Sequence, residues 1–173
     1  MKSLWKLIKR LLGFPPDPRP EQVGEHLITM REARDCHCAM VGTLLKISYE
    51  QASRALKHWN LPFFFESPVI SNPLNVKRAI MSLGWAVREI DWTELNTSDD
   101  LVPGKVAVLV HCPDSEIAGT LKQHWVVWFG RDSDGAHLLH WGIDQWFVTK
   151  PEGEMWALFR TSWPNCAFTV RKP

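Results

Sequence analysis

The spacing of hydrophobic and polar residues divides the chain into a helical first half and a strand-rich second half. Apolar residues recur with helical spacing, between helix start and stop signals, in three segments: 36–46, 48–60 and 73–83. Beyond Gly84 the pattern changes to the alternation typical of strands, in five segments: 85–90, 105–112, 124–130, 136–142 and 145–150. This order predicts an α+β domain in which N-terminal helices pack on an antiparallel β-sheet.

Local signals support several of these boundaries. Ser48 and Gln51 have the spacing of a capping box, which marks the start of a helix. Pro73 suits the first position of a helix, and Gly84 suits the residue just past a helix end. Residues 131–135, Arg-Asp-Ser-Asp-Gly, have the composition of a hairpin turn, so the strands on either side of them are expected to pair.

The first 24 residues follow a different pattern. Residues 1–14 predict a basic amphipathic helix, with apolar residues on one face and only basic charges on the other. Residues 15–24 are a proline-rich linker, and residues 25–173 form the α+β domain. We expect the helix to contact a partner protein or an anionic membrane surface, because its apolar face would otherwise be exposed to water. Packing back on its own domain is the alternative.

Composition narrows the range of functions. The formal net charge of +1 gives no general attraction to nucleic acid, so no nucleic-acid partner is expected. The N-terminus lacks the features of a signal peptide and no apolar run is long enough for a transmembrane helix, which predicts a soluble or peripheral protein. Ten tryptophans against one tyrosine indicate either a tryptophan-rich core or a flat binding surface, and the core is the favoured interpretation.

Cys36 is the candidate nucleophile. Asp35 suits the N-cap position, which puts Cys36 in the first helical turn, where unpaired backbone N–H groups and the helix dipole favour a thiolate. Cys38 lies two residues further on, so its side chain points to a different side of the helix. A cysteine nucleophile needs a base, and His124 opens a predicted strand that would present its imidazole at the edge of the sheet.

These residues carry a resemblance to a known family. The stretch Asp35-Cys36-His37-Cys38-Ala39-Met40 and the following residues 44–52 resemble the catalytic-cysteine helix of the papain-like peptidases that trim bacteriocin leader peptides, which read DCG.AAL and then G.SYEEA. The segment beginning at His124 and the hairpin 134–140 are similar to the H.VVV...DG..VHDP strand pair of that family. The resemblance covers about residues 30 to 145 and extends in part to bacterial cell-wall cysteine endopeptidases of the same superfamily.

The resemblance implies a papain-like fold and cysteine-peptidase chemistry without a cofactor, with Cys36 as nucleophile and His124 as general base. The aspartate of the family falls on Trp141 here, so His140 is expected to orient His124, as a histidine does in the cell-wall enzymes. With an odd-length loop at 131–135, strand pairing would put His140 and His124 on one face. Asp144 is the alternative third residue.

The chain also lacks the glutamine that supplies the oxyanion hole upstream of the family's cysteine. Arg31 is expected to donate in its place, together with the backbone N–H of Cys36.

The sequence thus predicts a hydrolase that cleaves a peptide, isopeptide or related amide bond through Cys36 and His124. The alternative is a catalytically degenerate papain-like module, of the kind found in phage particles or secretion systems, that binds partners and docks through its N-terminal helix. A metal site formed by Cys36, His37 and Cys38 with His111 and Cys112 is a weaker alternative, because Cys-x-Cys is not the usual spacing of structural zinc ligands.

Overall fold

The computed structural model describes residues 26–31, 35–60, 73–111, 123–140, 142, 146–149 and 167–173. The predicted amphipathic helix 1–14 and the linker 15–24 lie outside these ranges. Within them, no helix is long and apolar enough to cross a membrane.

The three predicted helices are present. They are α2 (Cys36–Leu45), α3 (Tyr49–Asn60) and α4 (Pro73–Ser82). The capping box at the start of α3 is confirmed, because the N–H of Ser48 donates to Oε1 of Gln51 (2.9 Å) and the N–H of Gln51 donates to Oγ of Ser48 (3.2 Å). Lys46 ends α2 in the left-handed conformation, with φ of 56°.

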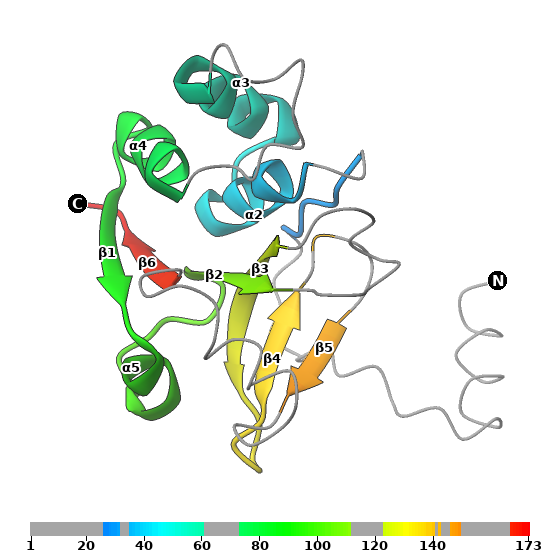
Figure 1. Ribbon diagram of the computed structural model, residues 1–173, viewed down its shortest axis with the longest axis vertical. Helices are drawn as coiled ribbons and strands as arrows, with labels where there is room; N and C mark the ends of the chain where they lie inside the picture. Colours follow the sequence, from blue (N-terminus) through cyan, green and yellow to red (C-terminus); the bar gives the residue numbers. More distant parts are fainter. Residues whose placement is uncertain are drawn as a thin grey trace, which may run out of the picture.

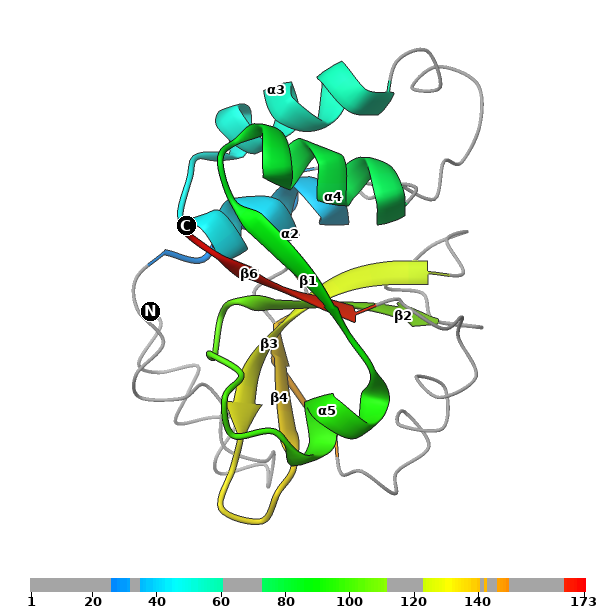
Figure 2. The same ribbon diagram turned by 90° about the vertical axis from the view of Figure 1, so that its left-hand side faces the viewer.

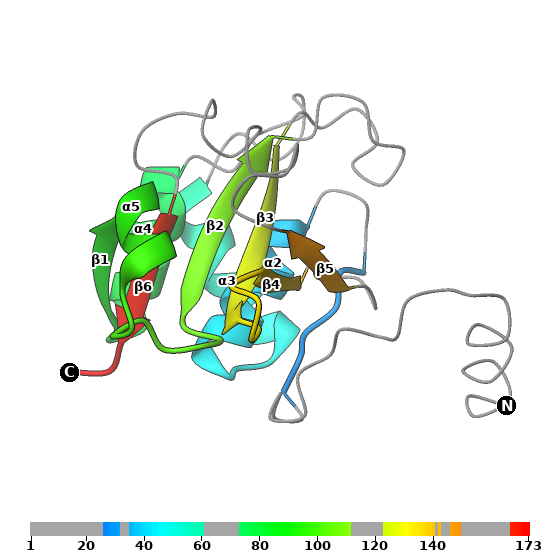
Figure 3. The ribbon, with the colours of Figure 1, turned by 90° about the horizontal axis from the view of Figure 1, so that it is seen from below.

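The strands form one antiparallel sheet in the order β1-β6-β2-β3-β4-β5. Five of them correspond to the predicted strands, with small shifts at their ends: β1 (Ala86–Ile90), β2 (Val106–His111), β3 (Gln123–Arg131), β4 (His137–His140) and β5 (Trp146–Thr149). The hairpin turn between β3 and β4 is also confirmed, since Oδ1 of Asp132 accepts from the N–H groups of Asp134 and Ala136. Figure 3 shows the strands side by side from below.

Two elements were not predicted. The short helix α5 (Trp92–Thr97) follows β1, and its N-cap Asp91 accepts a hydrogen bond from the N–H of Glu94 (2.7 Å). The strand β6 (Ala167–Arg171), near the end of the chain, lies between β1 and β2 and pairs with both. Through these pairings β6 connects β1 to the rest of the sheet.

Helices cover the two faces of the sheet unequally (Figures 1 and 2). On one face α2 packs against β3 and α4 packs against β1, while α3 lies against both helices. Trp125 and Val127 of β3 belong to this core, and the ring of Trp125 contacts Phe168 edge to face at 5.6 Å. The opposite face carries α5 and a second core, to which Val126 and Trp128 contribute. Trp125 and Trp128 are only 1% and 3% exposed, which confirms the core interpretation for these two tryptophans.

Candidate functional site

Asp35 occupies the predicted N-cap position of α2, but its carboxylate does not cap the helix. Its backbone carbonyl accepts from the N–H groups of Cys38 (2.8 Å) and Ala39 (3.2 Å), as the first turn requires. Oδ2 accepts instead from the N–H of Arg31 (3.0 Å) and from the hydroxyl of Tyr49. The buried carboxylate therefore fixes the start of α2 to the preceding segment and to α3.

The sulfur of Cys36 lies where the first turn of α2 meets the start of β3. The backbone N–H groups of Trp125, His37 and Cys36 itself donate toward it, and each of these contacts lowers the pKa of the thiol. The contact with Trp125 puts the sulfur against the peptide bond that joins His124 to Trp125. Two segments about ninety residues apart in sequence, each with a predicted site residue, are thus neighbours in the fold.

Burial outweighs these hydrogen bonds. It raises the pKa of Cys36 to about 11 from an ordinary value of 9.0, and the negative charge of Asp35 acts in the same direction. Cys36 is therefore a neutral thiol at neutral pH: the N–H groups at the helix start favour the thiolate as expected, but burial outweighs them. The helix start does supply donors, but the thiol is only 5% exposed and a carboxylate stands next to it.

Replacing Asp35 with asparagine tests this electrostatic account. The variant is expected to lower the pKa of Cys36, because the neighbouring negative charge is lost while an oxygen remains to accept from Tyr49. Since burial is the larger cause, the pKa should stay above its ordinary value. The measurement is the rate of Cys36 alkylation against pH, followed by peptide mapping. Asp99→Asn, at an exposed position, is the control, and an unchanged profile for Asp35→Asn would refute the role of the carboxylate.

His124 is the second residue of β3 and is 2% exposed. It pairs with Val110 of β2, a residue of the core on the α5 face. Side chains alternate between the two faces along a strand, so His124 is assigned to the same face of the sheet as Val126. Its neighbour Trp125 belongs to the face covered by α2. The structure therefore brings the backbone next to His124 to the sulfur of Cys36, and contact between the imidazole and the thiol stays a prediction.

The predicted relation between His140 and His124 is changed by a bulge in β3. Near the turn Arg131 pairs with His137, as the odd loop length requires, but the register shifts between Trp128 and Arg131. Beyond the bulge, His140 pairs with Val127. Because residues 124 and 127 are an odd number apart, alternation assigns the two histidines to opposite faces, and the parity argument for a shared face is wrong. The bulge is aided by Gly130, whose φ is +102°.

His140 lies on the face that α2 covers and is 2% exposed. Its ring contacts Phe129 (6.3 Å between centroids) and Trp146 (5.0 Å). The N–H of Gly142 donates to its Nδ1 at 3.4 Å, so the neutral ring carries its proton on Nε2. A Cβ on Gly142 would lie 3.0 Å from Cβ of Ala39, which shows how closely this segment approaches α2. The role of His140 as the third catalytic residue stays a prediction.

Arg31, the predicted oxyanion donor, is engaged with α3. Its guanidinium lies over the ring of Tyr49 at 4.2 Å and pairs with Glu50 at 2.6 Å, at an exposed position. This arrangement gives Arg31 a structural partner, and its role as an oxyanion donor, together with the backbone N–H of Cys36, stays a prediction. Trp141 and Asp144 lie outside the described residues.

Sequence reasoning missed two contributors to this site. The backbone N–H of Trp125 faces the sulfur of Cys36, and the hydroxyl of Tyr49 anchors Asp35. A backbone donor leaves no signal in the sequence, and the pairing of Tyr49 with Asp35 depends on how α3 folds back beside α2. In the described part of the chain, no three His, Cys, Asp or Glu side chains gather as a metal site would require.

Comparison with solved structures finds a similarity to the peptidase domain of Streptococcus ComA, a bifunctional ABC transporter involved in a quorum sensing pathway. The two share 17% sequence identity over 86% of this chain and 98% of that chain, with a TM-score of 0.58. No family model matches the sequence, and no curated protein matches it significantly. The similarity confirms the predicted fold, with helices packed on an antiparallel sheet as in papain-like peptidase domains.

Proposed function

We propose that the protein is a cysteine-dependent hydrolase that cleaves a peptide, isopeptide or related amide bond, with Cys36 as nucleophile and His124 as general base. The position of the Cys36 sulfur carries this proposal: it lies at the start of a helix, against the peptide bond between His124 and Trp125, in a chain with the fold of a peptidase domain. Backbone donors around a nucleophile support covalent catalysis, and the proposal requires in addition that the imidazole of His124 reaches the thiol.

The chemistry follows from a neutral thiol. As the sulfur attacks the carbonyl carbon, the imidazole of His124 takes the thiol proton, and we assign the N–H groups of Cys36 and His37, at the start of α2, as donors to the developing oxyanion. The protonated imidazole then gives its proton to the leaving amine, which leaves a thioester on Cys36. Water, activated by the same imidazole, hydrolyses the thioester and releases the acid with the thiol restored.

The raised pKa of Cys36 determines how this reaction starts. In many cysteine peptidases a thiolate is present before the substrate binds, whereas here the proton leaves during the attack itself. The proposal therefore requires that a bound substrate gains access to a sulfur that is almost fully buried. Displacement of side chains at the junction of α2 and β3 would provide that access.

The same burial favours a second candidate function. A buried, neutral thiol beside a carboxylate, with Arg31 engaged on α3, also suits a module that has kept the peptidase fold and binds partners without catalysis. In this case Cys36 is a small apolar core residue. The two candidates differ in whether any amide bond is cleaved in a Cys36-dependent manner.

A peptide library separates the two candidates without knowledge of the substrate. The purified chain is incubated with peptides derived from a whole proteome, and new termini are identified by mass spectrometry. If the protein is a hydrolase, we expect a set of new termini that share a sequence preference and appear in proportion to protein concentration. A library that stays intact at high protein concentration favours the binding module.

A further inference from the structure

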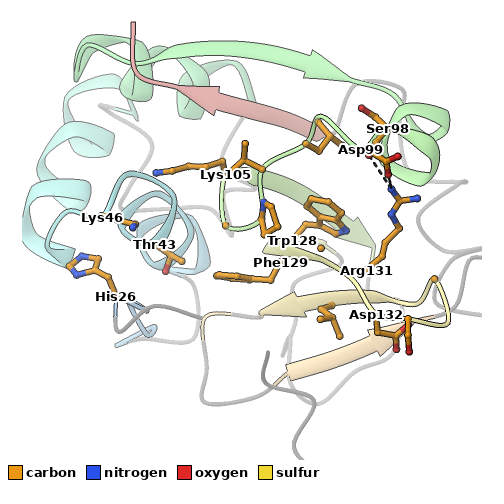
Figure 4. A pocket seen from close by; sticks show the side chains of 18 residues that line it. His26, Thr43, Lys46, Ser98, Asp99, Lys105, Trp128, Phe129, Arg131 and Asp132 are labelled. Atoms are coloured by element: carbon orange, nitrogen blue, oxygen red, sulfur yellow. Dashed lines mark hydrogen bonds and ion pairs between the residues drawn. The ribbon is translucent and has the colours of Figure 1, made fainter. Parts of the chain in front are cut away.

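The structure contains a cavity of about 1100 Å³ far from Cys36, at the opposite end of α2. Residues from the end of α2, the start of β2 and the hairpin between β3 and β4 line it. Figure 4 shows one end of the cavity formed by His26, Thr43, Lys46 and Lys105, and the other by Arg131 with its partner Asp99. The ring of Phe129 lies between the two ends. None of these residues belongs to the proposed catalytic site.

The two ends of the cavity differ in charge balance. At one end Arg131 pairs with Asp99 at 2.8 Å, so the two charges offset each other. At the other end, no carboxylate in the described part of the chain pairs with Lys46 or Lys105. Lys46 is close enough to Lys105 to contribute to lowering its pKa, after the larger effect of burial. Two neighbouring cations that pair with no described carboxylate therefore face one end of the cavity.

Lys105 is held in place by the fold. Its Nζ donates to the carbonyl of Leu44 in the last turn of α2 and lies 4.5 Å from the centre of the Trp85 ring. These contacts fix the ammonium group next to the cavity. They therefore reduce the side-chain entropy that is lost when a ligand binds. Lys46 is exposed and follows the helix directly. A fixed cation beside an exposed one suits the recognition of a single anionic group.

Phe129 gives the cavity an apolar wall. Its ring is half-buried and lies against Gly104, where a Cβ would meet Cε1 of Phe129 at 3.1 Å. Gly104 also has φ of +75°, so both its conformation and its lack of a side chain favour glycine at this position. On another side the ring contacts Trp146, with 5.0 Å between centroids. The ring is therefore held as a rigid surface between the lysines and the hairpin.

We propose that this cavity binds a small ligand that carries an oxyanion, a phosphate or carboxylate, attached to a flat apolar group. The oxyanion lies between Lys46 and Lys105, and the apolar group lies against Phe129. The opposite orientation is disfavoured because the hairpin end of the cavity presents the carboxylates of Asp99 and Asp132. Such a ligand would supply a negative charge to two lysines that have no carboxylate partner among the described residues, and it would use the aromatic wall between the ends.

Two simple compounds and their fragments test the proposal. Phenyl phosphate and benzoate are titrated into the full chain at constant ionic strength, with backbone amide NMR shifts as the readout, and inorganic phosphate and acetate serve as the compounds without a ring. We expect shifts at Lys46, Lys105 and Phe129, with phenyl phosphate or benzoate binding about tenfold more tightly than its ringless counterpart. The better of the two aromatic compounds identifies the oxyanion. Equal affinity for ringless and aromatic compounds, or no saturable shift from any of them, would overturn the proposal.

Matched variants control for general charge effects. Lys46→Gln is expected to weaken the binding of the better aromatic compound about tenfold, because the change removes one of the two cations. Lys57→Gln removes a lysine from the exposed surface of α3, outside the cavity, and is expected to leave the affinity unchanged. Both variants are first checked for an unchanged melting temperature. Equal weakening in the two variants would show an attraction to overall charge and would refute the site.

Discussion

Replacing Cys36 with alanine is expected to lower the rate of amide hydrolysis by about 10³-fold or more, because the covalent intermediate forms on its sulfur. The change removes one atom from a side chain that is 5% exposed, so the fold should persist with a stability loss of about 1 kcal/mol. The measurement is the rate at which a peptide selected from the library is cleaved, together with the melting temperature of each variant.

Cys38→Ala is the matched control for this loss. Cys38 lies two residues further along α2, is 4% exposed, and loses the same atom from the same core. It should destabilise the protein to a similar extent and leave hydrolysis within a few-fold of the original rate. Hydrolysis that survives in Cys36→Ala, or that is lost equally in both variants, would contradict a nucleophilic role for Cys36.

Acidification from pH 7 to pH 4.5 is expected to destabilise the protein through two buried histidines. Burial is the main cause that lowers the pKa of His37 and of His137 from 6.5 to about 4, although Asp35 and Asp132 partly oppose it. Between pH 4 and pH 6.5 these two histidines therefore bind protons more readily in the unfolded chain than in the folded protein. The contribution of each neutral histidine to the free energy of unfolding is fully present above pH 6.5 and is lost as the pH falls toward 4. It amounts to on the order of 2 to 3 kcal/mol for each histidine.

His137 is the better site for testing this dependence, because each of its ring nitrogens has a hydrogen-bond partner in the structure. The indole N–H of Trp128 donates to its Nδ1 (2.9 Å), so the neutral ring carries its proton on Nε2 and donates to Oδ1 of Asn96 (3.0 Å). Protonation would place a second N–H against that of Trp128 and a charge inside the core. The neutral ring is thus required for the contact between β3, β4 and α5.

The variant His137→Asn keeps an acceptor for the indole but does not titrate. It should be less stable than the original protein at pH 7 and should lose less stability on acidification, as measured by urea unfolding at several pH values. His58→Asn, at an exposed position at the end of α3, is the control and is expected to keep the original pH dependence. If His137→Asn and the original protein show parallel curves, His137 does not contribute to the acid sensitivity.

Most of the fold could be predicted from the sequence because its signals are local. The helical spacing, the capping box at Ser48 and the turn at 131–135 all act within a few residues, and the structure contains each of them. Helix α5 is only six residues long, too short for a periodic pattern, although Asp91 and Glu94 have capping spacing that could have revealed it. Strand β6 pairs with strands some sixty to eighty residues earlier, and no local pattern specifies such a pairing.

The candidate site was less predictable, because it depends on how elements pack. The position of Cys36 at a helix start could be predicted from Asp35 and the apolar spacing that follows. Its raised pKa could not, since it results from burial between α2 and the sheet. The bulge at Gly130 also escaped prediction, and a shift of one residue was enough to move His140 to the face opposite the one that alternation assigns to His124.

The position of the acyl group during turnover shows whether Cys36 is the nucleophile. The original protein is mixed with its most rapidly cleaved library peptide, the reaction is stopped with acid within the first turnovers, and the protein is digested and mapped by mass spectrometry. We expect an acyl group on Cys36 alone, with none detected in Cys36→Ala and slower formation in His124→Ala. An acyl group on another residue, or cleavage that leaves Cys36 unmodified and continues in Cys36→Ala, would contradict Cys36 as the nucleophile.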